Sequence, residues 1–491
     1  MKKYIISIDQ GTTSTRALLL DLQGKPLYKA QREVECLFPK PGYVEQSAER
    51  IFISVIDVIN ELLVVSMASM DEVAGIGITN QRETAVVFER DGKPIHNAIV
   101  WQSKQTQALC DERQGLCDFI KAKTGLRMNP YFSASKVRYI LDAVPGAQLR
   151  AERGELLFGT IDTYLIYMLT RGKSHLTDPS NASRTLLFDI HSLRFDKELC
   201  DIWDIPMAML PKVQDNCSDF GEASYLPGHV HIYGVAGDQQ ASLFGQGCFD
   251  EGDSKNTYGT GCFMLMNTGG KPIESQNGLL TTIAWTEGGK PTYALEGSVF
   301  IGGAIVQWLR DQTRWFHSSS ESEEYAKRKP DTAGIYFVPA FVGLGTPWWN
   351  DEARGAIFGL TRGADRHNIV RAGLYSIAYQ SKDVIETMKR DTGLQLKMLK
   401  VDGGASANGL LMQFQSDILG IPVCLPCELE TTAIGAGYMA LIGAGIMKGK
   451  EDVKRCIRQG RCYQPAMDKE EADRLYGGWL SAVKAAMAFK P

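Results

Sequence analysis

The sequence has no long uninterrupted hydrophobic segment. Met1-Lys2-Lys3 is followed by a run of only five residues, 4–8, before Asp9, which is too short for the core of a signal peptide. An uncharged stretch at residues 431–447 contains four glycines and falls short of the roughly 20 apolar residues that a membrane span needs. We therefore expect no membrane span, and we expect residues 431–447 to form a buried helix.

The sequence also lacks a basic excess. It has 491 residues, with 53 Lys and Arg against 57 Asp and Glu, so its formal net charge is −4. Nucleic-acid-binding proteins normally carry a positive excess, so this balance argues against nucleic acid as a partner. A hydrophobic fraction of 44% argues against a disordered chain and indicates a soluble globular protein.

The cysteines lack the pattern of a disulfide framework. There are eleven, an odd number, scattered from Cys36 to Cys462. Cys424-Leu-Pro-Cys427 is the one CxxC pair, and a zinc site would need a second pair. A metal site and a redox motif stay open as alternatives, but structural cysteines in a reducing cytoplasm are the favoured interpretation.

Strand patterns alternate with helix patterns along the chain. Residues 4–8 and 73–79 are apolar runs typical of buried strands. Apolar positions recur at spacings of three and four across residues 51–63, which predicts a helix that Ser47 can cap. Asp365 can cap a later helix. This alternation is typical of an α/β protein.

Three glycine-rich turns each follow a predicted strand, at residues 9–14, 258–261 and 402–408. Backbone amides in such turns can converge on phosphate oxygens, and threonine hydroxyls add donors. A nearby carboxylate can hold Mg²⁺ directly or through water. One such turn alone is more often a tight turn with a capping Asp. Three of them in this order predict a site for phosphate groups and Mg²⁺.

Two other nucleotide motifs fail. The Walker pattern needs a glycine five residues before Gly172-Lys-Ser174, where the sequence has Tyr167. Gly435-Ala-Gly437 loosely matches a dinucleotide fingerprint, but no acidic residue follows at the required distance. Close helix packing is the favoured interpretation of these glycines, and a dehydrogenase is a distant alternative.

Several motifs resemble those of the carbohydrate-kinase branch of the actin-like ATPase fold, and within that branch the glycerol kinases. The resemblance spans Lys3 to about Trp479. Three segments match the branch in general, at residues 9–16, 131–136 and 355–359. Three more match motifs that are particular to the glycerol kinases, at residues 80–84, 236–240 and 256–263.

The resemblance implies an α/β architecture of two actin-like, ribonuclease-H-like domains with a cleft between them. We expect an N-terminal domain at residues 1–246, with the polyol site and the first phosphate turn. A C-terminal domain at residues 247–491 would then hold the nucleotide site.

The resemblance also implies that Asp238 is the general base that accepts the proton of a substrate hydroxyl. Its alternative is a helix N-cap, and the two roles are compatible. Arg82 and Glu83 would bind the substrate hydroxyls, which requires a loop there because adjacent strand residues point to opposite faces. A surface ion pair is the alternative for these two residues.

The remaining polyol residues implied by the resemblance are two apolar ones and two polar ones. Trp101 and Phe263 would cover the carbon face of glycerol, although either can be an ordinary core aromatic. Tyr131 and Gln239 would complete the polar contacts.

The nucleotide residues implied by the resemblance come from all three turns and one helix. They are, for the phosphates, Thr12, Thr13, Ser14, Arg16, Gly259 and Thr260, and, for adenosine, Gly303, Gln307, Gly404 and Asn408. Asp9 would be the Mg²⁺ partner. Close packing at Gly303 and a helix cap at Asn408 are the open alternatives.

The sequence departs from the glycerol kinases at a few positions. Lys104 and Gln105 lie where two arginines are usual, which changes the charge at the cleft rim. Tyr139 replaces a usual tryptophan, and Tyr375 replaces a usual acidic residue.

The predicted function is ATP-dependent phosphorylation of glycerol in the cytoplasm by a homo-oligomer, a dimer or tetramer. The alternatives are a kinase for another small polyol or sugar and a non-catalytic nucleotide switch of the same superfold.

Overall fold

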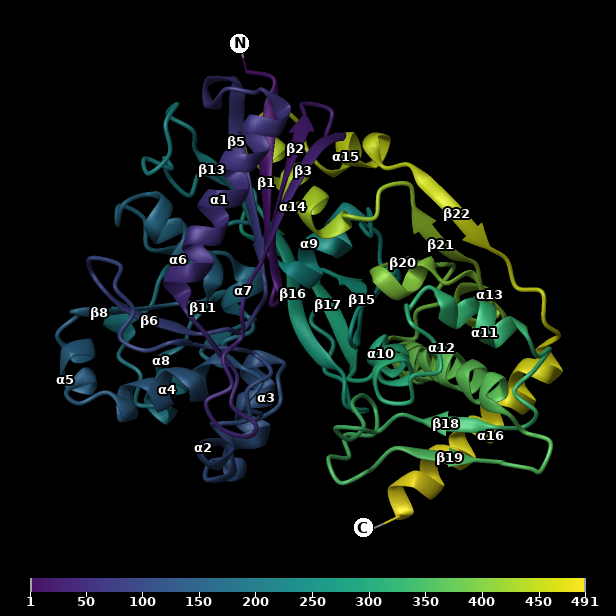
Figure 1. Cartoon of the computed structure of the whole chain (residues 1–491). Coiled ribbons are helices and arrows are strands. Elements are labelled where there is room, and N and C mark those ends of the chain that lie inside the picture. The colour runs from purple at the N-terminus through teal and green to yellow at the C-terminus, as the bar shows by residue number, and fades with distance from the viewer. Residues whose placement is uncertain (1, 490–491) are drawn as a thin grey trace.

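The computed structural model describes residues 2–489 and divides into two halves, each built on its own β-sheet (Figure 1). The N-terminal sheet lies at the top of the view, and the C-terminal sheet lies below and to its right. None of the helices among residues 2–489 combines the length and the apolar character of a membrane span.

The N-terminal sheet has five strands in the order β13-β5-β1-β2-β3. Its members are β1 (Tyr4–Gln10), β2 (Ser14–Asp21), β3 (Pro26–Glu33), β5 (Val73–Asn80) and β13 (Ile232–Gly237). The first three pair antiparallel, whereas β5 and β13 run parallel to β1. The carboxyl ends of β1, β5 and β13 therefore meet at one edge of the sheet, where open α/β sheets bind ligands.

The C-terminal sheet has seven strands in the order β16-β17-β15-β14-β20-β21-β22. Its members are β14 (Ser254–Tyr258), β15 (Cys262–Gly269), β16 (Leu280–Glu287), β17 (Lys290–Val299), β20 (Leu399–Asp402), β21 (Val423–Pro426) and β22 (Gln459–Tyr463). Here too an antiparallel hairpin, β14-β15, is followed by strands parallel to its first member. The two sheets therefore share a pattern of an antiparallel hairpin next to parallel strands.

Helices cover both sheets. On the N-terminal side these are α1 (Ala48–Ser66), α6 (Ile161–Leu169) and α9 (Asp238–Gly245), and on the C-terminal side α10 (Ala304–Asp311), α11 (Glu321–Lys327), α12 (Arg366–Thr392), α13 (Gly409–Leu419), α15 (Lys450–Cys456) and α16 (Lys469–Ala488). Ser47 and Asp365 cap α1 and α12 as predicted, because their side chains accept backbone N–H groups of the first turn.

Helix α14 (Thr431–Gly443) belongs to the C-terminal half but packs on α9 and on strands β1, β5 and β13 of the N-terminal sheet. A Cβ atom at Gly435 would lie 1.9 Å from the Ala241 carbonyl oxygen. The glycines of the Gly435-Ala-Gly437 motif therefore serve close packing, as favoured above, and the buried helix expected at residues 431–447 is present.

The segment between β5 and β13 adds a lobe beside the N-terminal sheet (Figure 1). Its helices are α2 (Gln107–Asp111), α3 (Cys117–Thr124), α4 (Ser133–Ala143), α5 (Ala147–Glu152), α7 (Pro179–Ala182) and α8 (Lys197–Ile202). Its strands pair in twos: β6 (Val86–Glu89) with β8 (Leu156–Gly159), β9 (Leu176–Thr177) with β12 (Lys212–Val213), and β10 (Phe188–Asp189) with β11 (Arg194–Phe195). Two further pairs are β4 (Glu45–Gln46) with β7 (Ala98–Ile99), and β18 (Tyr336–Val338) with β19 (Ala356–Phe358) in the C-terminal half.

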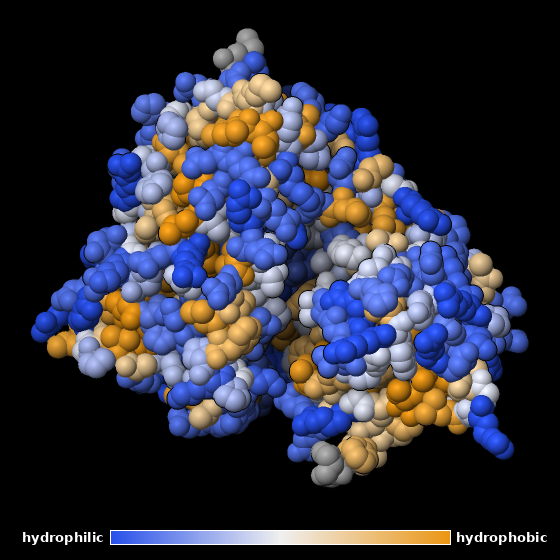
Figure 2. Space-filling model, in the orientation of Figure 1, coloured by the Kyte–Doolittle hydropathy of each residue, from blue (hydrophilic) through white to orange (hydrophobic). Residues whose placement is uncertain are grey.

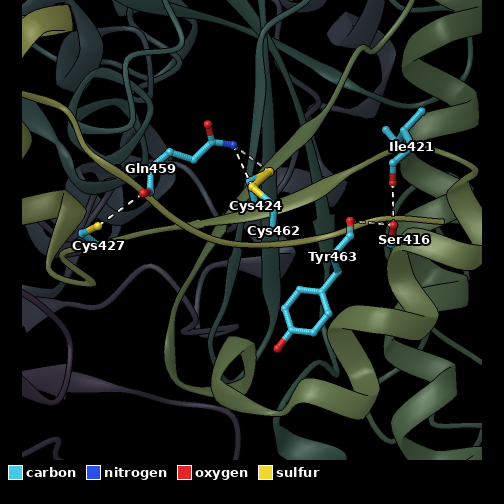
Figure 3. The surroundings of a disulfide bond; sticks show 7 residues. All are labelled: Ser416, Ile421, Cys424, Cys427, Gln459, Cys462 and Tyr463. Carbon is cyan, nitrogen blue, oxygen red and sulfur yellow. Dashed lines mark hydrogen bonds between the residues drawn. A yellow bond between two sulfur atoms is a disulfide. The ribbon is translucent and has the colours of Figure 1, made fainter. Parts of the chain in front are cut away.

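One disulfide joins Cys424 on β21 to Cys462 on β22 (Figure 3). These residues are direct cross-strand neighbours, and the Gln459 side-chain amide contacts both sulfur atoms. The expectation of unpaired cysteines is wrong for this pair, because strand pairing brings together two residues 38 positions apart. The other member of the CxxC pair, Cys427, is a free and exposed thiol.

Candidate active site

The first glycine-rich turn connects β1 to β2. The Gly11 N–H donates to the Ser14 carbonyl, which closes the turn. Ser14 is buried, whereas Thr13 is exposed at the tip. Arg16 on β2 lies 3.6 Å from the Asp9 carboxylate and 3.4 Å from Glu430. The turn thus presents hydroxyls and one cation at the binding edge of the N-terminal sheet.

The second and third turns lie against each other in the C-terminal half. Gly403 approaches the backbone of Tyr258 so closely that an added Cβ would lie 2.6 Å from its carbonyl oxygen. The Gly259 carbonyl accepts the Gly303 N–H at 2.8 Å, and the Thr260 carbonyl accepts the Ala304 N–H at 3.1 Å. The second turn is therefore fixed to the start of helix α10.

The residues expected at adenosine surround these two turns. Gln307 is an exposed residue of α10, and Gly404 has open space where a Cβ would lie. Gly303 packs closely on Gly259, as its alternative interpretation holds. Asn408 caps α13 by accepting the Leu411 N–H at 3.0 Å. The close packing at Gly303 and the helix cap at Asn408 are thus both present. The nucleotide-binding roles of these residues stay predictions.

Asp238 is the first residue of α9, directly after β13. Its Oδ1 atom accepts the Gln239 N–H at 2.7 Å and lies 3.2 Å from Arg82 Nε. The side chain keeps 29% of its surface exposed, so a substrate hydroxyl can reach the free oxygen. The geometry is compatible with a general base held by a helix start and a guanidinium.

Arg82 and Glu83 lie in a loop after β5, as their joint role requires. Glu83 has a left-handed backbone, with φ of 61°. The two side chains are not a surface ion pair, because Arg82 is 3% exposed and Glu83 is 1% exposed. Arg82 pairs with Glu296 and Glu83 with Arg184, so each of the two has its own buried partner.

Three aromatic rings form one wall across the two halves. The Trp101 ring lies 5.6 Å from Tyr131 and 5.9 Å from Phe263, both edge to face. Phe263 belongs to β15 of the C-terminal half, directly after the second turn. The Trp101 indole N–H donates to Thr12 Oγ1 at 2.8 Å. Trp101 therefore joins the first phosphate turn to the aromatic wall.

Burial, together with the charges of Asp238 and Glu430, raises the pKa of Asp9 to about 7, against the lowering effect of Arg16. The negative charge of Asp238 thus acts on the protonation of Asp9. Among residues 2–489 no cluster of three His, Cys, Asp or Glu side chains could hold a metal alone. A single carboxylate fits Mg²⁺, which keeps several waters and takes its other ligands from substrate phosphates.

Sequence reasoning missed three buried charged residues around the site: Arg184, Lys255 and Glu296. Lys255 on β14 donates to the Gln239 side chain, and burial lowers its pKa to about 8. Lys255 directly precedes the quoted 256–263 segment, and that position is the one signal that could have found it. The partners of Arg184 and Glu296 lie about 100 and 200 residues away in the chain, so no local pattern connects them.

The departures noted in the sequence have local explanations. The Gln105 amide donates to Glu45, and Lys104 is exposed. Tyr375 stacks on Phe414 at 3.5 Å, and its hydroxyl accepts from Arg371 at 3.0 Å. These contacts are structural, and none of them involves a predicted site residue. Tyr139 makes an edge-to-face contact with the His96 ring and packs against the buried apolar cluster of its lobe.

The predicted residues lie around the junction of the two halves, where the surface is hollowed (Figure 2). Two other cavities, of about 630 and 760 Å³, contain none of the predicted site residues. The smaller is lined by residues of α4 and the larger by residues of α12 and α16. Neither cavity is therefore the predicted site.

Two family models cover most of the chain. The N-terminal domain of the FGGY family of carbohydrate kinases matches residues 4–245, and its C-terminal domain matches residues 254–444. The chain belongs to the FGGY family of carbohydrate kinases. The family resemblance read from the sequence is thereby confirmed.

Curated relatives show which kinases the chain is similar to. The chain is 53% identical to a glycerol kinase of Listeria welshimeri and to one of Bacillus mycoides, each over the full length of both proteins. A crystal structure of Plasmodium falciparum glycerol kinase with ADP superposes with a TM-score of 0.92 at 35% identity, covering 99% of this chain and 98% of that one.

A kinase structure of lower sequence identity shares the fold. A ligand-bound xylulose kinase from Lactobacillus acidophilus has a TM-score of 0.89 at 22% identity, covering 99% of each chain. The predicted α/β fold of two actin-like domains is therefore confirmed. The boundary at residues 246 and 247 stays a prediction.

Proposed function

We propose that this FGGY kinase transfers the γ-phosphoryl group of ATP to glycerol and yields sn-glycerol 3-phosphate. The observation that carries the proposal is full-length 53% identity to glycerol kinases, joined to a site whose residue types suit a small polyol. Arg82 and Glu83 are a donor fork and an acceptor for hydroxyl groups. Trp101 and Phe263 offer an apolar wall for the CH groups.

Asp238 is the general base of the proposed reaction. Its free carboxylate oxygen takes the proton of the terminal glycerol hydroxyl. The oxygen of that hydroxyl attacks the γ-phosphorus at the same time. The new P–O bond forms on glycerol, the bond to the β-phosphate oxygen breaks, and ADP leaves. The Arg82 Nε group at 3.2 Å keeps the base oriented toward the polyol.

The nucleotide phosphates would bind between the first and second turns. The hydroxyls of Thr12, Thr13 and Ser14 and the cation of Arg16 supply donors on one side. On the other side Thr260 supplies its backbone amide, while the Gly259 N–H donates to the Gly261 carbonyl at 2.9 Å and Gly259 offers the phosphates a surface without a side chain. Gly303, Gln307, Gly404 and Asn408 would contact adenosine. Asp9 would hold Mg²⁺, which neutralises phosphate charge in such reactions.

The proposal also covers the oligomeric state and the cellular location of the protein. We infer a homo-oligomer, a dimer or tetramer, and exposed apolar residues at the end of α1, Val64 and Met67, support a protein contact there. We also infer a cytoplasmic location, where ATP is available.

A polyol panel tests the proposal. Purified protein is incubated with ATP, Mg²⁺ and either glycerol, erythritol, dihydroxyacetone or xylulose, and ADP release is followed. Glycerol is expected to give the highest kcat/KM, with glycerol 3-phosphate identified by ³¹P NMR. A roughly tenfold preference for a four-carbon polyol would overturn the substrate assignment, since that margin equals about 1.4 kcal/mol of transition-state binding. ATP binding without any phosphorylated polyol would indicate a nucleotide switch.

A further inference from the structure

A buried cluster of four charged side chains joins the two halves of the protein beside Asp238. It consists of Arg82 and Glu83 from the loop after β5, Arg184 after α7, and Glu296 on β17. None of the four is more than 3% exposed. Burial of unpaired charges is costly, so each member depends on the others for its position.

Glu296 is the centre of this cluster. Its Oε2 atom accepts from Arg82 Nη1 at 2.5 Å, and its Oε1 atom accepts from Arg82 Nη2 at 3.0 Å. The same Oε1 atom accepts from Arg184 Nη2 at 2.9 Å. Strand β17 pairs with both β15 and β16, so the backbone that carries Glu296 is held on two sides. A carboxylate fixed in this way sets the plane of the guanidinium that it clamps.

Arg82 has few free donors left. Its Nη1 atom also donates to Gln240 at 3.2 Å, and its Nε atom faces Asp238 at 3.2 Å. A guanidinium carries five N–H groups, and three of those of Arg82 donate to Glu296 and Gln240. Among residues 2–489 the Nε N–H, which faces the Asp238 carboxylate, and one N–H of Nη2 have no hydrogen-bond acceptor. The orientation that Glu296 imposes therefore decides where these two donors point.

Glu296 acts on Glu83 as well, through Arg184. Arg184 Nε donates to Glu83 Oε1 at 2.6 Å, while its Nη2 is held by Glu296. Without the Glu296 charge, two buried guanidinium groups would face each other with one carboxylate fewer between them. Both polyol-binding residues of the N-terminal half would then lose a fixed position.

We propose that Glu296 is the positioning residue that sets acceptor specificity, by orienting Arg82 directly and Glu83 through Arg184 toward the hydroxyls of the polyol. The inference rests on the proposed function, because it takes Arg82 and Glu83 as the polyol-binding pair. It adds that a carboxylate of the C-terminal half completes a clamp whose other members belong to the N-terminal half. The clamp is thus assembled only across the junction of the two halves.

The test compares Glu296→Gln and Glu296→Asp with the wild type on glycerol and on 1,3-propanediol, which lacks the central hydroxyl. Asp383→Asn is the matched control, because Asp383 is also buried and accepts from three side chains, Trp348, Tyr476 and Trp479, away from the groove. Measured quantities are kcat, the KM for each polyol, and the KM for ATP.

The wild type is expected to favour glycerol over 1,3-propanediol by roughly 100-fold in kcat/KM, as for loss of a hydroxyl bonded to charged groups. Glu296→Gln is expected to raise the glycerol KM at least about tenfold and to reduce the glycerol preference at least about fivefold, with the ATP KM within about twofold. Glu296→Asp keeps the charge and should restore part of the preference. Asp383→Asn should leave the preference unchanged.

Equal losses on both polyols in Glu296→Gln, or an unchanged glycerol KM, would overturn the positioning role. If Glu296→Gln fails to fold, the Glu296→Asp ratio decides, because a shortened carboxylate still shifts the Arg82 plane and must change the preference. Failure of the proposed function shows separately, in the wild type. If the wild type prefers another polyol, the same ratio is measured with that polyol and its deoxy analogue.

Discussion

The pH dependence of stability provides a sharp prediction at Glu296. Burial alone would raise the pKa of this carboxyl, but Arg184 and Arg82 overcome that effect and lower it from 4.5 to about 2. A carboxyl with a lowered pKa stabilises the folded state fully above its unfolded pKa, and the stabilisation is lost as the pH falls toward the folded pKa. The shift corresponds to about 3 kcal/mol at pH 7, at about 1.4 kcal/mol per pH unit.

The perturbation is Glu296→Gln, which removes this titration. Between pH 7 and pH 3.5 the wild type should lose about 1 kcal/mol more unfolding free energy than the variant, from the two pKa values and proton linkage. Urea unfolding is followed by tryptophan fluorescence and by circular dichroism, and the shared transition is compared at each pH. Equal losses in the two proteins would refute the assignment of a paired, ionised Glu296.

Asp383→Asn is a control of opposite sign. Burial raises the pKa of Asp383 to about 6, against hydrogen bonds from Tyr476, Trp479 and Trp348 that lower it. A carboxyl with a raised pKa stabilises the fold at low pH and loses that contribution as the pH rises through the folded value. The wild type should therefore lose stability relative to this variant between pH 4 and pH 7.

Three further predictions concern packing, the metal and the aromatic wall. Gly435→Ala should lower the unfolding free energy by about 1–3 kcal/mol, because its Cβ would meet the Ala241 carbonyl at 1.9 Å. Gly477→Ala on α16 should raise the unfolding free energy by about 0.5–1 kcal/mol, because its Cβ would enter open space. Urea midpoints that rank the two variants in the reverse order would contradict this. Because Asp9 has a pKa of about 7, binding of Mg²⁺ and ATP at pH 6.5 should release protons in titration calorimetry, and Asp9→Asn should release fewer; equal release would remove Asp9 from the metal site. Trp101→Phe loses the hydrogen bond to Thr12 and should lower kcat/KM by roughly 2- to 10-fold, and an unchanged value in steady-state assays would mean that this contact is unimportant.

The sequence predicted the parts of the site that depend on local patterns. The three glycine-rich turns follow strands β1, β14 and β20, because a strand that ends at a binding edge needs a tight polar turn there. The loop at Arg82 and Glu83 was predicted from the need for both side chains to face one substrate. The left-handed backbone of Glu83 confirms that loop.

Long-range contacts could not be predicted. Glu296 meets Arg82 across 214 positions, and Cys424 meets Cys462 across 38. Helix α14 belongs to the C-terminal half but packs on the N-terminal sheet. Its small residues predict close packing, but they do not predict which surface the helix packs against. Each of these depends on the tertiary arrangement, which no short segment encodes.

In the proposed reaction the Asp238 carboxylate removes the proton of the substrate hydroxyl. The most direct measurement is the turnover of Asp238→Asn with glycerol and ATP, together with glycerol binding by calorimetry. We expect kcat to fall by at least about 10²-fold, as for loss of a positioned base, with glycerol affinity nearly unchanged. Turnover at the wild-type rate in this variant would contradict it.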